Sequence, residues 1–249
     1  DVRVAVEDWP AMLQQARDLA VAVTRKVPGL SRAETQEASA FLDWLADNHF
    51  TFLGYREYRL ERGPSVDRLV PVAKSGLGLL RTGAGRPRAQ TTLLRGEVRR
   101  KAREAVALVV TKANSVSTIH RATYLDYVGV KTFDARGRVM GERRFIGLFT
   151  SATYSASPRE IPLLRHKVQR VIDHFGISPV SHDGKALMHV LESHPRDELF
   201  QASIAELVRS FRGIVNLYER RRVRLLLRRD PYRRFFSCLL YVPRDRYNT

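Results

Sequence analysis

The chain has 249 residues, of which 44% are hydrophobic and 28% charged, with a formal net charge of +17 and one cysteine, Cys238. This length is sufficient to bury a hydrophobic core, and the composition excludes a disordered or fibrous protein. A chain with one cysteine cannot form an internal disulfide, and this favours a cytoplasmic location. No apolar run reaches the roughly 18 residues that a membrane-spanning helix needs. We therefore expect no membrane partner.

The positive charge makes nucleic acid the first acidic partner to consider. The basic stretch 81–103, however, contains no aromatic side chain on which single-stranded bases could stack. Its glycines and proline predict a solvated loop that leads into a short helix. Nucleic-acid binding is therefore the less favoured alternative function.

Two helices are predicted at the N-terminus, within residues 1–48. Asp8 and Pro10 predict the start of the first helix, which Pro28 and Gly29 end. Ser31 and Glu34 have the spacing of a capping box and predict the start of the second helix, which reaches about Asp47. Because the chain begins with Asp1 rather than methionine, we expect a piece of a longer protein.

An antiparallel sheet is predicted next, with strands over 50–60, 69–74, 105–112, 123–134 and 138–151. The segment 105–112 is apolar enough to predict a central strand, buried on both faces. Gly137 supplies a positive φ in the turn 135–137 and predicts a hairpin. A helix follows Pro158 and closes at Gly176, and its apolar face is expected to cover the sheet.

The C-terminal third is predicted to be helical and then to form two strands. One helix starts near Asp183, and a longer one runs from Pro195 to about Tyr218. Strands are expected over 223–230 and 235–243, around a turn at Asp230 and Pro231. Two strands alone are marginal in water, so we expect them to pack on the helices or to associate with another chain.

No motif in the sequence predicts catalysis, a cofactor site or a metal site. The histidines of segment 182–194 lack a metal-ligand spacing, the glycines of 76–85 do not form G-x-G-x-x-G, and Cys238 is expected to be a buried, inert thiol. The densest mixture of His, Arg, Tyr and Asp near a strand predicts one possible effector pocket, for an anionic metabolite. Its residues are His120, Arg121, Tyr124 and Asp126.

Five long strings, at 41–58, 120–134, 143–155, 181–200 and 222–249, resemble the N-terminal regulatory region of the large bacterial NAD-specific glutamate dehydrogenases. They read FLDWLADNHFTFLGYREY, HRATYLDYVGVKTFD, RRFIGLFTSATYS, SHDGKALMHVLESHPRDELF and RVRLLLRRDPYRRFFSCLLYVPRDRYNT. The resemblance covers nearly all of residues 31–249.

The resemblance implies an α+β fold: an antiparallel PAS-like sheet with covering helices, a helical connector and the first strands of an ACT-like module. The implied domains are N-terminal helices (1–48), a PAS-type domain (49–176), a helical connector (177–221) and a truncated ACT-like module (222–249). It also implies a non-catalytic regulatory or assembly segment of a homo-oligomeric enzyme.

The parent enzyme so implied converts L-glutamate, NAD and water to 2-oxoglutarate, ammonia and NADH. NAD would belong to the parent, with no cofactor in this segment, because the family's catalytic lysine and dinucleotide fingerprint have no counterpart here. The implied partners are the rest of the parent chain, neighbouring subunits and a small-metabolite effector.

Overall fold

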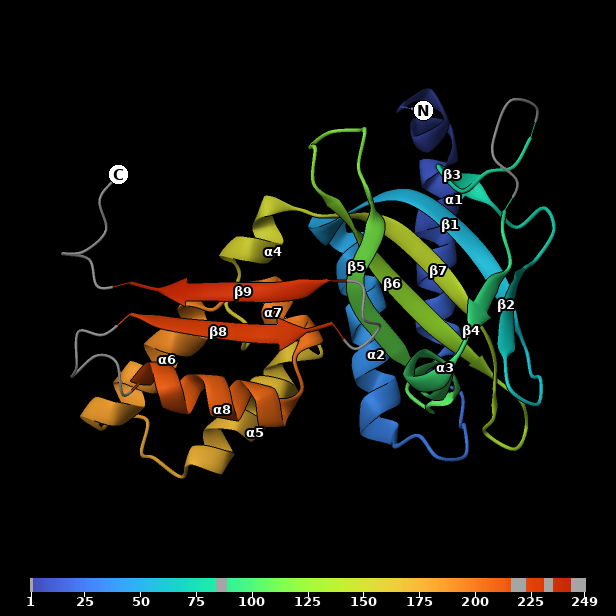
Figure 1. Cartoon of the computed structure of the whole chain (residues 1–249). Helices are drawn as coiled ribbons and strands as arrows, with labels where there is room; N and C mark the ends of the chain where they lie inside the picture. The colour runs from blue at the N-terminus through green and yellow to red at the C-terminus, as the bar shows by residue number, and fades with distance from the viewer. Residues whose placement is uncertain (1, 84–88, 216–222, 231–234, 243–249) are drawn as a thin grey trace. The chain divides into compact units, whose positions relative to one another are not determined.

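The computed structural model describes residues 2–83, 89–215, 223–230 and 235–242 (Figure 1). The chain divides into two compact units, Asp1–Thr153 and Tyr154–Thr249. The first unit combines helices with a large antiparallel sheet, and the second combines helices with a two-stranded antiparallel sheet. The predicted α+β class is therefore confirmed.

Two helices open the first unit, α1 (Val2–Ala22) and α2 (Arg32–Trp44), and a short π-helical turn, η1 (Leu45–His49), follows them. The predicted capping box at the start of α2 is confirmed. The backbone N–H of Ser31 donates to the Glu34 carboxylate at 2.9 Å, and the N–H of Glu34 donates to the Ser31 hydroxyl at 3.2 Å. Two otherwise unpaired backbone donors are thereby satisfied.

The predicted start of α1 at Asp8 is wrong, because the helix already begins at Val2 and includes Pro10. Asp8 is buried and accepts hydrogen bonds from the Gly78 backbone N–H, at 2.7 Å, and from Arg81. The carboxylate therefore fixes α1 against a distant turn instead of capping its own helix.

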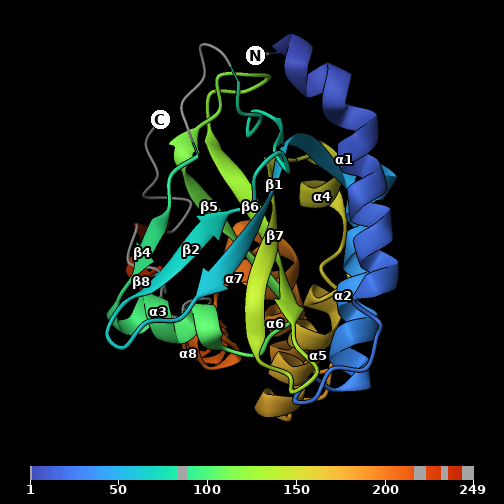
Figure 2. The ribbon, with the colours of Figure 1, turned by 90° about the vertical axis from the view of Figure 1, so that its right-hand side faces the viewer.

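The strands of the first unit form a seven-stranded sheet in the order β4-β2-β1-β7-β6-β5, with β3 also paired to β1. Their bounds are β1 (Phe50–Glu61), β2 (Asp67–Pro71), β3 (Leu77–Gly78), β4 (Thr92–Leu94), β5 (Leu108–Val116), β6 (Tyr124–Phe133) and β7 (Val139–Phe149). A helix, α3 (Gly96–Arg103), follows β4, so the short helix expected at the end of stretch 81–103 is confirmed. Figure 2 shows α1 and α2 along one side of the sheet, and α1 packs against β1 and β3.

The predicted hairpin is confirmed as β6 and β7. Gly137 lies in the turn with φ of 76°, a conformation that glycine adopts without steric cost. A Cβ atom at this position would also lie 2.1 Å from the carbonyl oxygen of Pro28. Glycine is therefore required here both by the turn and by the close approach of the chain.

The prediction of a central strand at 105–112 is wrong. β5 is the edge strand of the sheet, pairs only with β6 among the described strands, and is mostly half-buried or exposed. An apolar sequence alone does not distinguish an edge strand from a central one, because an edge strand that packs against other parts of the protein is also apolar.

An aromatic layer forms much of the buried core of the first unit. Phe52 and Tyr55 on β1 contact Phe145 on β7, and Phe50 meets Phe149 edge to face at a centroid distance of 5.3 Å. These rings are all less than 5% exposed. Large buried rings of this kind dominate the energetics of a core, so β1 and β7 form its centre.

The second unit contains α5 (Leu164–Phe175), α6 (His182–Ser193), α7 (Arg196–Gln201), α8 (Ile204–Val215), β8 (Arg224–Arg229) and β9 (Phe236–Tyr241); α4 (Ser151–Ser155) spans the boundary between the units. α5 ends at Gly176, in a left-handed conformation, as predicted. We expected α5 to cover the sheet of the first unit. Instead it belongs to the second unit, where it packs against α8.

The single long helix predicted over 195–218 is wrong within the described residues, because α7 and α8 are separate. Ser203 and Glu206 form a second capping box, in which the Ser203 N–H donates to Glu206 at 2.7 Å and the Glu206 N–H donates to the Ser203 hydroxyl at 3.3 Å. The S-x-x-E spacing at this position is the sequence signal for a separate helix start.

The two predicted C-terminal strands are confirmed, and they pair with each other in antiparallel register. Most of the predicted turn at Asp230 and Pro231 lies outside the described residues. Leu225, Leu227, Phe236 and Leu240 are more than half exposed, and Cys238 is exposed as well, so the expectation of a buried thiol is wrong. The cysteine alternates with inward residues on β9 and therefore lies on the outer face.

Candidate functional site

The structure brings together only part of the effector pocket predicted in the first unit. Asp126 is 2% exposed and binds Lys112 at 2.6 Å and the Phe149 backbone N–H at 3.0 Å. Arg121 donates to the Phe149 carbonyl at 2.8 Å. Arg121 and Asp126 thus both form hydrogen bonds with the backbone of Phe149, whereas the side chains of His120 and Tyr124 are exposed. The effector pocket therefore stays a prediction.

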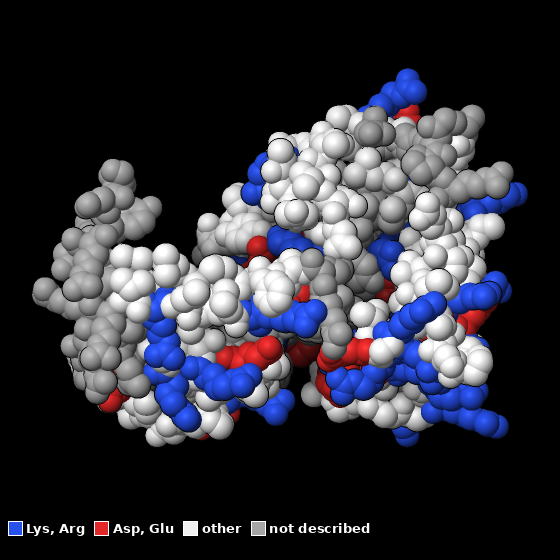
Figure 3. Space-filling model, viewed as in Figure 1, with Lys and Arg blue, Asp and Glu red and all other residues white. Residues whose placement is uncertain are grey.

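Most of the cations that the structure describes in the basic stretch 81–103 form ion pairs within the chain. Arg99 and Arg103 both bind the buried Asp67, at 3.0 and 2.6 Å, and Arg103 is the main reason that the pKa of Asp67 is lowered to about 2. Arg81 pairs with Asp8, and further ion pairs involve Arg100 and Lys101. Figure 3 shows acidic side chains among the basic ones on the face in view. The described part of the stretch is therefore no open cationic surface for nucleic acid.

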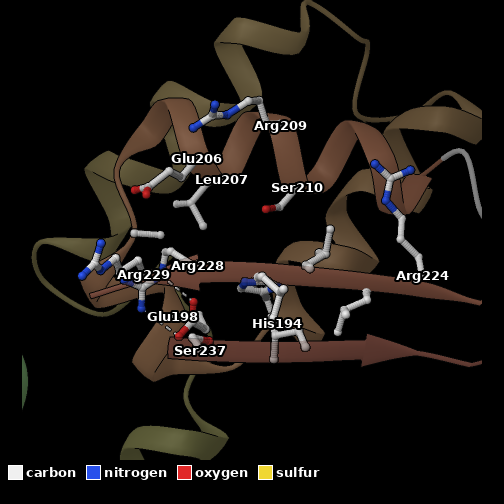
Figure 4. A pocket seen from close by; sticks show the side chains of 15 residues that line it. His194, Glu198, Glu206, Leu207, Arg209, Ser210, Arg224, Arg228, Arg229 and Ser237 are labelled. Atoms are coloured by element: carbon white, nitrogen blue, oxygen red, sulfur yellow. Dashed lines mark hydrogen bonds and ion pairs between the residues drawn. The ribbon is translucent and has the colours of Figure 1, made fainter. Parts of the chain in front are cut away.

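A cavity of about 410 Å³ lies in the second unit, between α8 and the β8–β9 sheet (Figure 4). This volume falls within the range of small-molecule sites. The lining residues come from the end of α6, from α7 and α8, and from both strands. They are His194, Glu198, Ala202, Glu206, Leu207, Arg209, Ser210, Arg224, Leu225, Leu226, Leu227, Arg228, Arg229, Ser237 and Leu239.

One end of this cavity is closed by a bidentate ion pair. The guanidinium of Arg228 on β8 donates to both carboxylate oxygens of Glu198 on α7, at 2.8 and 2.9 Å. Both side chains are about nine-tenths buried. Burial alone would raise the pKa of Glu198, but the bonds from Arg228 outweigh it and the pKa lies below its ordinary value. The pair therefore remains ionised and ties the strand to the helix.

Two further titratable groups lie beside this ion pair. Burial lowers the pKa of His194 to about 4, so the ring is neutral at pH 7; it lies 3.3 Å from the Tyr241 hydroxyl and meets Phe211 edge to face. Burial, and then the charge of Arg228, lower the pKa of Lys167 to about 8. The Lys167 ammonium donates to the carbonyls of Leu199, Phe200 and Ala202 at 2.7 to 3.0 Å, at the end of α7.

The opposite end of the cavity carries a cation, Arg224, and the hydroxyl of Ser210 lies between the two ends (Figure 4). Arg224 lies against Gly213 of α8, where a Cβ atom would come within 2.4 Å of the guanidinium carbon. Ser210 lies three residues before Gly213, on the same face of α8, and points into the cavity in Figure 4. Leu207, Leu226 and Leu239 also line the cavity, so part of its wall is apolar.

The arrangement favours binding rather than catalysis. His194 and Ser237 both line the cavity, but the Ser237 hydroxyl bonds to Glu198, and the hydrogen bond described for the His194 ring is with the Tyr241 hydroxyl. A nucleophile needs its base within hydrogen-bond reach. Over the described ranges, no three His, Cys, Asp or Glu side chains gather where they could hold a metal ion.

Sequence reasoning missed this cavity. Its residues are spread over 194–239, and none of them forms a known motif. Two features of the sequence could have indicated it. The spacing of Ser203 and Glu206 predicts that α8 starts separately from α7. Gly213, a glycine inside a predicted helix, indicates that another part of the chain packs closely against that helix. No helix within the described ranges is long and apolar enough to span a membrane.

Comparisons with known proteins give one consistent result. A family model described as glutamate dehydrogenase, helical motif 1, matches residues 161–220, and one described as glutamate dehydrogenase, ACT2 domain, matches residues 224–249. The cavity therefore lies where these two matched regions meet.

Three curated relatives align with the whole chain, and each is named NAD-specific glutamate dehydrogenase. Their identities are 42% in Halomonas elongata, 41% in Pseudomonas aeruginosa and 32% in Mycobacterium tuberculosis. The chain covers 16%, 15% and 14% of those proteins, respectively. It thus corresponds to about 15% of the relatives' length.

Proposed function

Because this chain belongs to the family of large NAD-specific glutamate dehydrogenases, we propose that it is a non-catalytic regulatory and assembly segment of such an enzyme. The whole enzyme would oxidise L-glutamate with NAD and water to 2-oxoglutarate, ammonia and NADH. The observation that carries the proposal is the match of residues 161–249 to a helical motif and an ACT2 domain, on a chain without a dinucleotide fingerprint. NAD would bind elsewhere in the parent enzyme.

Within this segment, we assign the assembly role to the second unit. The Glu198 and Arg228 pair joins the helical motif to the ACT-type strands, and breaking one partner of such a buried pair leaves an uncompensated charge. The sheet of the first unit is proposed as the PAS-type sensor module, with His120, Arg121, Tyr124 and Asp126 as its candidate effector residues. The partners proposed are the remainder of the parent chain and neighbouring subunits.

The test compares two arginine variants in the whole dehydrogenase. Arg228→Met removes the buried ion pair, whereas Arg212→Met makes the same chemical change at an exposed position of α8. We expect Arg228→Met to change the subunit assembly seen by light scattering, or the glutamate saturation curve, and to leave the KM for NAD unchanged. Arg212→Met should resemble the unmodified enzyme.

Two results would overturn the proposal. An Arg228→Met enzyme with normal assembly and a normal glutamate curve would remove the assembly role of the second unit. A variant whose KM for NAD alone rises would place this segment at the cofactor site.

Nucleic-acid binding gains no support from the comparisons, and the ion pairs of the basic stretch also weigh against it.

A further inference from the structure

The polar groups that line the cavity of the second unit are not equally available to a ligand. Both oxygens of Glu198 accept from Arg228, and Glu206 accepts from the backbone and hydroxyl of Ser203. The acidic groups are therefore engaged within the protein. Arginines outnumber glutamates in the lining, so the remaining charge is positive.

Arg224 is the cation at the end of the cavity opposite the ion pair of Glu198 and Arg228 (Figure 4). Its described hydrogen bond is a long one, 3.4 Å, to the Gly213 carbonyl, and no described carboxylate lies within ion-pair distance of it. In contrast, Arg228 at the other end has a bidentate carboxylate partner. A guanidinium that faces a cavity without a carboxylate is suited to an anionic ligand.

Gly213 lowers the stability of α8, and the position of Arg224 explains why a glycine is nevertheless present there. A glycine inside a helix makes the helix less stable than alanine would at the same position. At this position a Cβ atom would lie 2.4 to 2.8 Å from three guanidinium atoms of Arg224. The missing side chain thus leaves the room in which Arg224 lies against α8 at Gly213, one turn after Ser210.

Beyond this polar end, the cavity becomes apolar. Leu207 lies one turn before Ser210 on α8, and Leu226 follows Arg224 on the same face of β8. Leu239, opposite Leu226 in the sheet register, also lines the cavity. A ligand that fills the site would therefore pair an anionic head with an apolar body.

We propose that this cavity binds a small carboxylate with an apolar side chain, whose carboxylate contacts Arg224 and Ser210 and whose apolar part lies against the leucines. Such a ligand bridges α8 and β8, so its binding stabilises the docking of the ACT-type strands on the helical motif. The binding step concerns the second unit alone. Its regulatory consequence rests on the function proposed above.

Isothermal titration of the chain with three related probes tests the chemistry. Hexanoate has both features, hexanamide lacks the charge, and acetate lacks the apolar body. We expect hexanoate to bind at least about tenfold more tightly than either, the ratio that one charge-assisted hydrogen bond gives. Equal binding of hexanoate and hexanamide would remove the anion site, and equal binding of hexanoate and acetate would remove the apolar one.

Two variants locate the site without breaking the buried ion pair. Arg224→Gln removes the charge. Gly213→Ala displaces the flexible guanidinium while it raises the helix propensity of α8. Both should weaken hexanoate binding about tenfold or more, and Arg212→Gln, an equal change at an exposed site on the same helix, should not.

The outcome that overturns the proposal is hexanoate binding that is absent in the unmodified chain, or unchanged in both Arg224→Gln and Gly213→Ala. Gly213→Ala discriminates better between the two explanations. If this glycine has a purely structural role, the variant should be more stable and should bind hexanoate with unchanged affinity. Failure of this test leaves the assembly role of Arg228, tested by light scattering, intact. The two proposals are therefore distinguishable.

Discussion

At the residue scale, the most informative side chains are polar groups buried by contacts that are remote in sequence. Asp8 lies 70 residues before Gly78, whose backbone it binds, and Glu198 lies 30 residues before Arg228. The sequence around each residue predicts a helix start; Glu198 does lie in the first turn of α7, whereas Asp8 lies inside α1. Their actual partners depend on tertiary packing, which a local pattern does not contain.

His194 gives a prediction at this scale. Because its pKa is about 4 in the folded chain and its ordinary value is 6.5, the folded chain binds fewer protons than the unfolded chain between these values. Stability therefore falls as the pH drops through this window, by up to about 3 kcal/mol. His194→Gln should lose this part of the pH dependence in urea unfolding at pH 7 and pH 4.5.

His182→Gln is the matched control, since His182 is an exposed histidine at the start of α6. The control should keep the pH dependence of the unmodified chain. If His194→Gln and His182→Gln lose stability in parallel as the pH falls, burial of the neutral His194 ring is not the cause.

At the scale of elements, sequence patterns predicted what each segment forms more reliably than what it packs against. The capping box at Ser31, the turn glycine Gly137 and the terminating Gly176 were all visible, because the backbone geometry of a cap or a turn is a local requirement. The central position predicted for β5 and the sheet predicted as the packing partner of α5 were wrong, since β5 is an edge strand and α5 packs against α8. Apolar periodicity shows that a face is buried, but it does not identify the partner.

The capping box of α2 gives the next prediction. Ser31→Ala removes the hydroxyl that accepts the Glu34 N–H, and should lower the free energy of unfolding by about 1 kcal/mol. Ser31→Asp supplies another oxygen at the cap and should recover most of the loss. Equal losses in the two variants, measured by urea denaturation, would show that the cap does not stabilise the helix.

The packing of α5 gives a third prediction. Val168 is 1% exposed, whereas Ile172 on the same helix is only half-buried. Val168→Ala should therefore destabilise the chain by on the order of 1–3 kcal/mol, and Ile172→Ala by less, although it deletes the larger side chain. The reverse order of the two denaturation midpoints would contradict the observed burial.

At the scale of the whole molecule, the function was predicted from the resemblance to a known family, whereas the fold class could be predicted from hydrophobic and turn patterns. The long ordered strings, such as 41–58 and 222–249, indicated the dehydrogenase family, and the comparisons confirm it. The candidate cavity was not predicted, because its walls come from two helices and two strands that meet only after folding. The net charge of +17 suggested a different function, yet many of the described cations are engaged in ion pairs.

The central proposal is that this segment is part of a glutamate dehydrogenase and does not carry out its chemistry. Glutamate-dependent NADH formation, followed by absorbance for the purified chain and for the whole enzyme that contains it, tests both halves directly. We predict NADH formation by the whole enzyme and none by the chain alone at equal molar concentration. NADH formation by the chain alone, or a whole enzyme that does not oxidise glutamate with NAD, would contradict the account.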